Sequence, residues 1–306
     1  MTKLLQHRVE YGALRMLLGF LALFPLAFAR RIGEALGALG YWPLGIRRRV
    51  VVRQIAAAFP GLDRRGVREI ARGAYRSLGR TAVESVLVSR LGSDGVLSLF
   101  ESEDDWTPIQ EAMSDGKGAV LVGGHFGNWE LSAAYLAARG VPLDVIVRRQ
   151  ANPFFDDWIT RTRRNLGLLV VHDSDAVRRV PRAFREGRAV GFVADQGVLG
   201  LASTFVPFFG RPAKTPRGPA VFALKYKLPM IFISAVLQPG RRYRLVVESI
   251  PVTESGDRER DVDVAVARFT AVLERFVRQY PEQYFWHHRR WRRQPPETPL
   301  ELREPV

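Results

Sequence analysis

The 306-residue chain contains no cysteine. This absence excludes disulfide bonds, a thiolate nucleophile, cysteine-ligated zinc and iron–sulfur clusters. The chain also lacks the HExxH pattern of zinc hydrolases, the P-loop, the GxGxxG pattern of dinucleotide-binding folds and the GxSxG turn of serine hydrolases. We therefore expect no bound cofactor, no metal and no acyl-enzyme serine.

Negative charge is in short supply, because 46 Lys and Arg face only 31 Asp and Glu, which leaves a formal charge of +15. Such a balance favours polyanionic partners: nucleic acid, anionic lipid or phosphorylated substrates. The chain has no zinc finger, no basic zipper and no interleaving of aromatic and basic residues as in an RNA-binding sheet. We therefore expect anionic membrane lipids as partners, and no nucleic acid.

Long hydrophobic runs are also scarce, and residues 16–29 form the only extended uncharged apolar stretch. A full membrane span needs roughly 20 apolar residues, and this run is shorter and contains Pro25. Basic residues flank it, and no signal-peptide cleavage site follows it. The pattern predicts an N-terminal hydrophobic membrane helix, interfacial or barely spanning, and a core helix is the alternative. Residues 47–59 predict a basic amphipathic helix suited to an anionic membrane surface.

From about residue 118, short apolar runs alternate with helical patterns, which is typical of an α/β fold. We predict a mixed, largely parallel central sheet flanked by helices. The predicted strands span residues 119–122, 143–147, 168–171, 189–194, 230–237 and 243–249. The predicted domains are a membrane-anchoring segment (1–45), a catalytic domain (46–295) and a loosely ordered tail (296–306).

One histidine lies in the stretch AVLVGGHFGNWELSAAYL, residues 119–136. His125 follows a predicted strand and a glycine pair, Asn128 is a good helix N-cap, and Glu130 falls in the first helical turn. A histidine at a strand end, with a carboxylate to hold its tautomer, is the arrangement of an oriented general base. The alternative is a capping histidine beside a solvated glutamate.

Two other polar residues also follow predicted strands, Arg148 and Asp195, and sites in α/β sheets lie at such strand ends. Arg148, and Arg163 on the next helix, are candidates to bind phosphate, although a solvated basic face is the alternative. Asp195 and Gln196 are expected to brace the site loop by hydrogen bonds and to touch substrate.

Two further segments carry weaker signals. Residues 205–212 predict an apolar loop that lines an acyl pocket, with plain core packing as the alternative. Residues 286–291 combine tryptophan, histidine and arginine, which indicates an aromatic and basic edge at a membrane interface.

The histidine block, together with residues 53–84, 148–167, 192–231 and 280–296, resembles the late acyltransferases of lipid A biosynthesis, within the lysophospholipid acyltransferase superfamily. The resemblance implies transfer of a fatty acyl chain from acyl carrier protein to a hydroxyl of a lipid A precursor. It implies an H-x4-[DE] motif in which His125 is the base and Glu130 its partner. The intervening Phe-Gly-Asn-Trp departs from the best-studied enterobacterial members and resembles other members of the family. It also implies an enzyme at the inner (cytoplasmic) membrane with its catalytic domain on the cytoplasmic side.

The residues expected to bind substrate are Asn128, Arg148, Arg163, Asp195 and Gln196. Oxyanion donors are expected to be backbone amides between Gly124 and Asn128, or an arginine. Two alternatives to the lipid A acceptor remain open. One is an acyltransferase acting on another phospholipid or glycolipid, and the other is a basic membrane- or nucleic-acid-binding module without catalysis.

Overall fold

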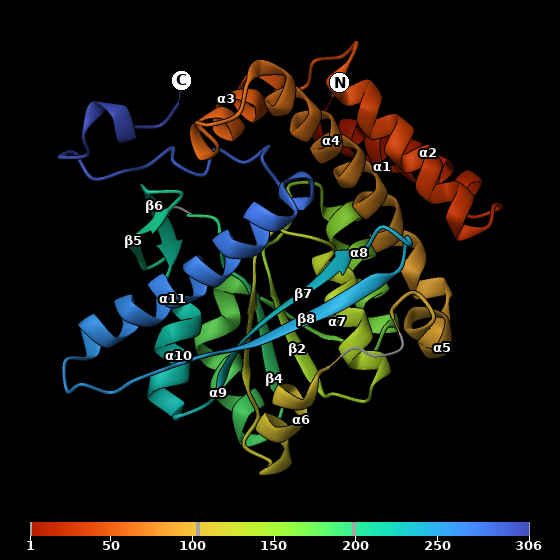
Figure 1. Cartoon of the computed structure of the whole chain (residues 1–306). Coiled ribbons are helices and arrows are strands. Elements are labelled where there is room, and N and C mark those ends of the chain that lie inside the picture. The colour runs from red at the N-terminus through yellow and green to blue at the C-terminus, as the bar shows by residue number, and fades with distance from the viewer. Residues whose placement is uncertain (1, 102–104, 198–199, 306) are drawn as a thin grey trace.

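The computed structural model describes residues 2–101, 105–197 and 200–305. At its centre is a six-stranded sheet of order β3-β2-β4-β1-β7-β8, in which only β8 runs antiparallel to its neighbour (Figure 1). The predicted fold class, a mixed and largely parallel sheet flanked by helices, is confirmed. The six strands are β1 (Val120–Gly123), β2 (Leu143–Val147), β3 (Leu169–His172), β4 (Ala189–Val193), β7 (Met230–Leu237) and β8 (Tyr243–Ile250).

Helices cover both faces of this sheet, because alternate strand residues point to opposite sides. Val120 and Val122 of β1 belong to one buried cluster, and Leu121 between them belongs to the other. The first face is covered by α9 (Ala176–Arg185), α10 (Gly218–Tyr226) and α11 (Arg258–Gln279). The second is covered by α5 (Gly92–Leu97), α6 (Thr107–Ser114) and α7 (Trp129–Ala138), while α8 (Pro153–Asn165) links β2 to β3.

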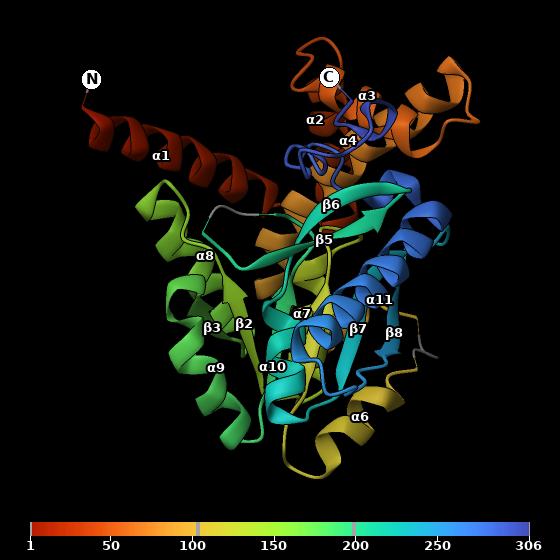
Figure 2. The same ribbon diagram turned by 90° about the vertical axis from the view of Figure 1, so that its left-hand side faces the viewer.

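Four further helices gather at the end of the sheet where the parallel strands finish (Figure 2). They are α1 (Lys3–Leu21), α2 (Leu26–Tyr41), α3 (Arg48–Ala58) and α4 (Arg64–Leu87). Helix α2 lies so close to α4 that a Cβ atom on Gly37 would come within 2.0 Å of the Tyr75 carbonyl oxygen. A Cβ atom on Gly79 would come within 2.0 Å of the Gly33 carbonyl oxygen. These glycines allow the two backbones to touch.

The apolar run at residues 16–29 is not one helix, contrary to the sequence-based expectation. Helix α1 ends at Leu21, the chain turns, and α2 starts at Leu26. The reason is Pro25, which disfavours helical geometry in the preceding residue and fits only at the start of the second helix. Over the residues that the structure describes, no helix is both long and apolar enough to cross a bilayer.

Residues 203–216 form a hairpin and not the predicted loop. Strands β5 (Ser203–Phe208) and β6 (Arg211–Pro216) pair antiparallel outside the main sheet. The C-terminal segment returns to this hairpin: Arg211 donates to the Arg303 carbonyl at 2.9 Å, and Gln294 donates to the Pro212 carbonyl at 3.1 Å. Arg289 and Glu304 pair at 2.5 Å, which fixes the chain beyond residue 296 to the segment that precedes it.

Candidate active site

The register of two neighbouring strands brings His125 and Asp195 together. Gly123 at the end of β1 pairs with Val193 at the end of β4, and each candidate residue lies two positions further along its own chain segment. Parallel strands end at the same edge of the sheet, so both side chains emerge there side by side. His125 Nδ1 lies 2.6 Å from Asp195 Oδ1.

The charge state of Asp195 determines which ring nitrogen carries the hydrogen. Burial opposes ionisation of this carboxyl, but the charge and hydrogen bond of His125 and the charge of Arg290 bring its pKa down to about 2. An ionised carboxylate only accepts hydrogen bonds, so Nδ1 must be the protonated nitrogen. In the neutral imidazole Nε2 then carries no hydrogen, on a side chain that is 26% exposed, whereas the Asp195 side chain is 1% exposed.

Two residues from the C-terminal segment are buried next to Asp195. Arg290 donates to the Lys214 carbonyl at 2.7 Å and to Thr215 Oγ1 at 2.7 Å, so its guanidinium is anchored on β6. Burial lowers the pKa of Arg290, and burial together with Asp195 raises the pKa of the Tyr284 hydroxyl. Sequence reasoning missed both residues, because nothing in their spacing links them to a strand some 90 positions away.

Glu130 is not the partner of His125, contrary to the sequence-based interpretation. It forms a two-bonded pair with Arg163 of α8, at 3.0 Å from Nε to Oε2 and 2.5 Å from Nη2 to Oε1. The pair is largely buried, and Glu130 raises the pKa of Arg163 although burial opposes the charge. The physical reason is that Glu130 belongs to the first turn of α7, where its carboxylate points toward α8. Asp195 lies beside His125 because β1 and β4 are neighbouring parallel strands whose ends are in register.

The loop between β1 and α7 is held by the C-terminal segment and by β7. The Gly127 amide donates to the Gln283 carbonyl at 2.9 Å, the Phe285 amide donates to the His125 carbonyl at 2.9 Å, and the Asn128 amide donates to the Ala235 carbonyl at 2.8 Å. Gly127 has φ of +60°, and a Cβ atom there would lie 2.2 Å from a carbonyl oxygen, so only glycine fits. The amides of Gly127 and Asn128, both named as oxyanion candidates, are thus already engaged.

Aromatic rings flank the imidazole. The Trp129 ring packs edge-on at 5.0 Å between centroids, and the Phe285 ring lies 5.9 Å away. These contacts restrict rotation of the His125 ring, so the hydrogen bond to Asp195 and the two rings together define the direction of Nε2.

The other predicted substrate-binding residues lie in different environments. Asn128 is fully buried: its Oδ1 caps α7 by accepting from the Leu131 amide at 3.1 Å, and its Nδ2 donates to Glu84 at 2.8 Å. Arg148 is exposed just beyond β2, and within the described residues it makes no ion pair. Gln196 is half-buried directly after Asp195.

The segment from Trp286 to Trp291 lies in the core, although the sequence indicated an interfacial edge. Both tryptophans are 0% exposed, because they pack against Phe208 and Phe209 of the hairpin. Burial lowers the pKa of His287 and of His288 to about 4. Over the described parts of the chain, no group of three or more histidine, aspartate and glutamate side chains is arranged to hold a metal ion.

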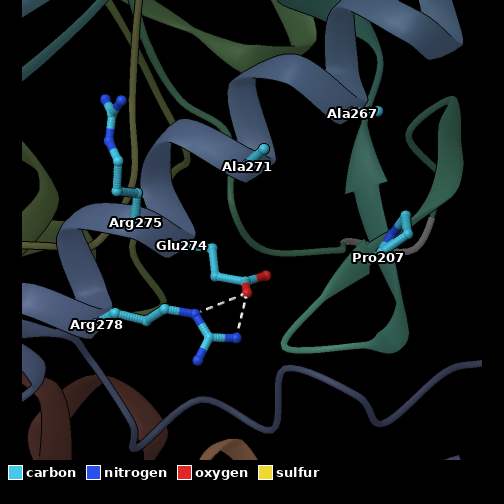
Figure 3. Close-up of a pocket in the computed structure, with 6 residues that line it drawn as sticks. All are labelled: Pro207, Ala267, Ala271, Glu274, Arg275 and Arg278. Atoms are coloured by element: carbon cyan, nitrogen blue, oxygen red, sulfur yellow. Dashed lines mark hydrogen bonds and ion pairs between the residues drawn. The ribbon is translucent and has the colours of Figure 1, made fainter.

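A hollow with a volume of about 390 Å³ lies between α11 and the hairpin (Figure 3). It is lined by Pro207, Ala267, Ala271, Glu274, Arg275 and Arg278. Arg278 pairs with Glu274 inside it, at 2.6 Å. None of these residues belongs to the group around His125.

Comparison with known proteins shows the class of enzyme. The chain is 25% identical over 280 residues to the lipid A biosynthesis lauroyltransferase of Escherichia coli strain K12, covering 90% of this chain and 89% of the relative. It is 24% identical over 266 residues to the lipid A biosynthesis palmitoleoyltransferase of the same organism, covering 86% and 85%. A phosphatidylinositol mannoside acyltransferase of Mycobacterium tuberculosis is 30% identical over 122 residues, 38% of each chain.

The fold, the strand-end site and these relatives together define an acyltransferase. A sequence model of the bacterial lipid A biosynthesis acyltransferases matches residues 3–293. The chain belongs to that family.

Proposed function

We propose that the chain is a membrane-associated O-acyltransferase that moves a fatty acyl group from an acyl thioester to a hydroxyl of a lipid A precursor. The observation that carries the proposal is the hydrogen bond between His125 and Asp195 at the carboxyl edge of the sheet. In the proposed reaction Asp195 takes the orienting role that the sequence assigned to Glu130, and His125 remains the base.

The reaction needs a base for the hydroxyl and a proton donor for the leaving thiolate. His125 Nε2 removes the hydroxyl proton as the oxygen attacks the thioester carbonyl carbon. The resulting imidazolium is stabilised by the Asp195 carboxylate, to which Nδ1–H already donates. When the carbon–sulfur bond breaks, Nε2 returns the proton to the thiolate, so the residue ends as it began.

Arg163 is proposed to bind phosphate on the acceptor. A guanidinium has five N–H donors in a planar fork, and Glu130 occupies two of them in this structure. Glu130 then holds the Arg163 guanidinium in position. The guanidinium N–H groups that Glu130 does not occupy can donate to a phosphate oxygen of the acceptor. Arg148, which is exposed at the neighbouring strand end, is a second candidate for the same phosphate-rich acceptor.

Membrane association is proposed from the distribution of exposed apolar side chains. Thirteen of the twenty large hydrophobic residues that the structure exposes lie between Leu4 and Ile46, on α1, α2 and the turns after each. Arg47, Arg48 and Arg49 follow directly. Apolar residues that enter the lipid boundary beside cations that contact anionic headgroups are typical of interfacial attachment. We place the enzyme at the inner membrane with its site facing the cytoplasm.

Acyl carrier protein is the proposed donor, by analogy with the family, and the net charge of +15 suits an acidic protein partner. A second acceptor class, another glycolipid or a phospholipid, is favoured by one observation. The partial match to a mannoside acyltransferase shows that related sequences serve acceptors other than lipid A.

The test uses purified full-length enzyme in detergent, with acyl-carrier-protein thioester and a lipid A precursor, and product detection by mass spectrometry. We expect His125→Ala and Asp195→Asn each to lower kcat by a factor on the order of 10²–10⁴, without unfolding the protein. Glu130→Gln should mainly raise KM for the phosphorylated acceptor, because it releases Arg163. Near-parental turnover by folded His125→Ala enzyme would exclude His125 as the base, whereas absence of product from the parent would favour the non-catalytic binding module.

A further inference from the structure

A buried carboxylate, Glu84 of α4, lies between the N-terminal helices and the loop that carries His125 (residues 124–128), here called the catalytic loop. It is 1% exposed and interacts with three other elements. Its Oε1 pairs with Arg30 of α2, and its Oε2 accepts from Asn128 Nδ2 at 2.8 Å and from the Tyr243 hydroxyl of β8 at 2.5 Å. The reaction described above makes no use of this group.

Asn128 connects Glu84 to the catalytic loop by hydrogen bonds. The two ends of its amide have different partners, since Oδ1 accepts from the Leu131 amide and Nδ2 donates to Glu84. A carboxylate can only accept, so it fixes which way the amide faces. Asn128 is three residues from His125 and is the N-cap of α7, so the loop carrying His125 is set from this end by Glu84.

The counter-charge for Glu84 comes from α2. A carboxylate taken out of water is costly unless it is paired and hydrogen-bonded, and the Arg30 side chain, itself 9% exposed, supplies the pairing cation. Arg30 is brought there by the close packing of α2 on α4 at Gly33, Gly37 and Gly79. The orientation of Asn128 therefore depends on α2 being seated against α4 (Figure 1).

We propose that Glu84 is a positioning residue for His125, acting through Asn128. Through the ion pair of Arg30 with Glu84, the position of the catalytic loop also depends on the packing of α2 against α4. The proposal rests on His125 being the base, and it adds a role for the N-terminal helices beyond attachment. A purely structural Glu84 would affect how much enzyme folds, whereas a positioning Glu84 affects the turnover of each folded molecule.

The experiment compares Glu84→Gln and Asn128→Ala, singly and combined, in full-length enzyme in detergent. We expect each single variant to lower kcat per folded molecule by about 10- to 100-fold, since small misplacements of a catalytic group have effects of this order. KM should stay within about twofold, and the double variant should be no slower than the slower single variant, because the two residues act in one chain of contacts.

Glu34→Gln is the matched control. Glu34 also joins the same two helices through a carboxylate, pairing with Arg80 of α4 at 3.1 Å and with Arg241 at 3.0 Å, and among the described residues it does not contact the catalytic loop. We expect its kcat to equal that of the parent. If Glu84→Gln fails to fold, Arg30→Met combined with Glu84→Gln removes both buried charges together, and kcat per folded molecule is measured on that double variant.

Amide hydrogen exchange over residues 124–132 gives a readout independent of activity. Faster exchange there in Glu84→Gln, and parental exchange in Glu34→Gln, support the proposal. Parental kcat and parental exchange in folded Glu84→Gln overturn it. Failure of the proposed function would look different: His125→Ala would remain active, while hydrogen exchange would still report whether Glu84 orders the loop.

Discussion

At the scale of single residues, the His287 ring is buried in surroundings that disfavour a positive charge on it. Its ring packs edge-on against Tyr75 at 4.3 Å between centroids and stacks on Phe285 at 5.3 Å. Neither ring nitrogen has a hydrogen-bond partner among the described residues. Burial and the charge of Arg47 lower its pKa from 6.5 to about 4.

This environment makes the stability of the protein sensitive to acid. Between pH 6.5 and about 4 the unfolded chain binds a proton at His287 and the folded chain does not, so stability falls as the pH falls. The slope from one such group is at most about 1.4 kcal/mol per pH unit. His288 acts in the same direction, whereas the stability associated with Asp195 is lost only below pH 3.8.

We expect His287→Phe to reduce the drop in Tm between pH 7.5 and pH 5.0 relative to the parent. Phenylalanine keeps the aromatic contacts and removes the nitrogens that lack partners. Melting in detergent at the two pH values measures this. An unchanged drop in Tm would mean that His287 already binds its proton in the folded state.

Residue-level sequence reasoning located His125 and Asp195 but could not pair them. The pairing depends on β1 lying next to β4 with Gly123 opposite Val193, and 70 residues separate the two side chains. The sequence therefore indicated the nearer carboxylate, Glu130, from its place in the first helical turn and from the H-x4-[DE] motif. Arg163 was correctly placed on a helix, but its bond to Glu130 depends on how α7 and α8 pack.

At the scale of secondary-structure elements, the contact between α2 and α4 is a backbone-to-backbone contact made possible by glycine. A methyl group on Gly79 would meet the carbonyl oxygen of Gly33 at 2.0 Å, and this atom belongs to a helix backbone that cannot move by itself. Any larger residue must push the whole of α2 away from α4.

We expect Gly79→Ala to destabilise the enzyme by about 1–3 kcal/mol, the usual range for overpacking. Gly19→Ala is the matched control, because Gly19 also lies within a helix but has nothing within 4 Å of its would-be Cβ atom. It should stabilise α1 by about 0.5–1 kcal/mol, as expected for alanine in a helix. Thermal melting compares the two, and equal Tm values would contradict the close-contact argument.

Most elements of the sheet were predictable because buried strands leave short apolar runs between turn residues. The predicted range 143–147 coincides with β2, and 230–237 coincides with β7. The hairpin of β5 and β6 was missed because it contains Pro207 and Pro212, and proline weakens a strand pattern. Its turn also places Phe209 at φ of +51°, where the Phe209 amide donates to Glu274 at 2.6 Å.

At the scale of the whole molecule, exposed apolar surface is concentrated at one end. Met16 is 74% exposed and Leu23 is 80% exposed, near the break between α1 and α2, whereas Val177 on α9 is an isolated case at 82%. A cluster of exposed apolar residues indicates an interaction surface, and single ones do not.

We expect the parent protein to stay bound to anionic vesicles in 1 M salt, since apolar insertion is not screened by ions. Met16→Glu combined with Leu23→Glu should leave only the charge-dependent part, so that salt releases the protein. Val177→Glu is the control and should behave like the parent. Flotation of vesicles at low and high salt measures this, and salt release of the parent would exclude apolar insertion.

Closure of the catalytic loop by the C-terminal segment also constrains when during synthesis the enzyme can become active. The carbonyl of Gln283 and the amide of Phe285 hold the loop that carries His125, and Arg290 is buried beside Asp195. Strands β1 and β4 leave the ribosome many seconds earlier at about 5–20 residues per second. A nascent chain that already contains the N-terminal helices but lacks these C-terminal residues therefore has no ordered catalytic loop. Acyl transfer can therefore begin only after nearly all of the chain has been translated.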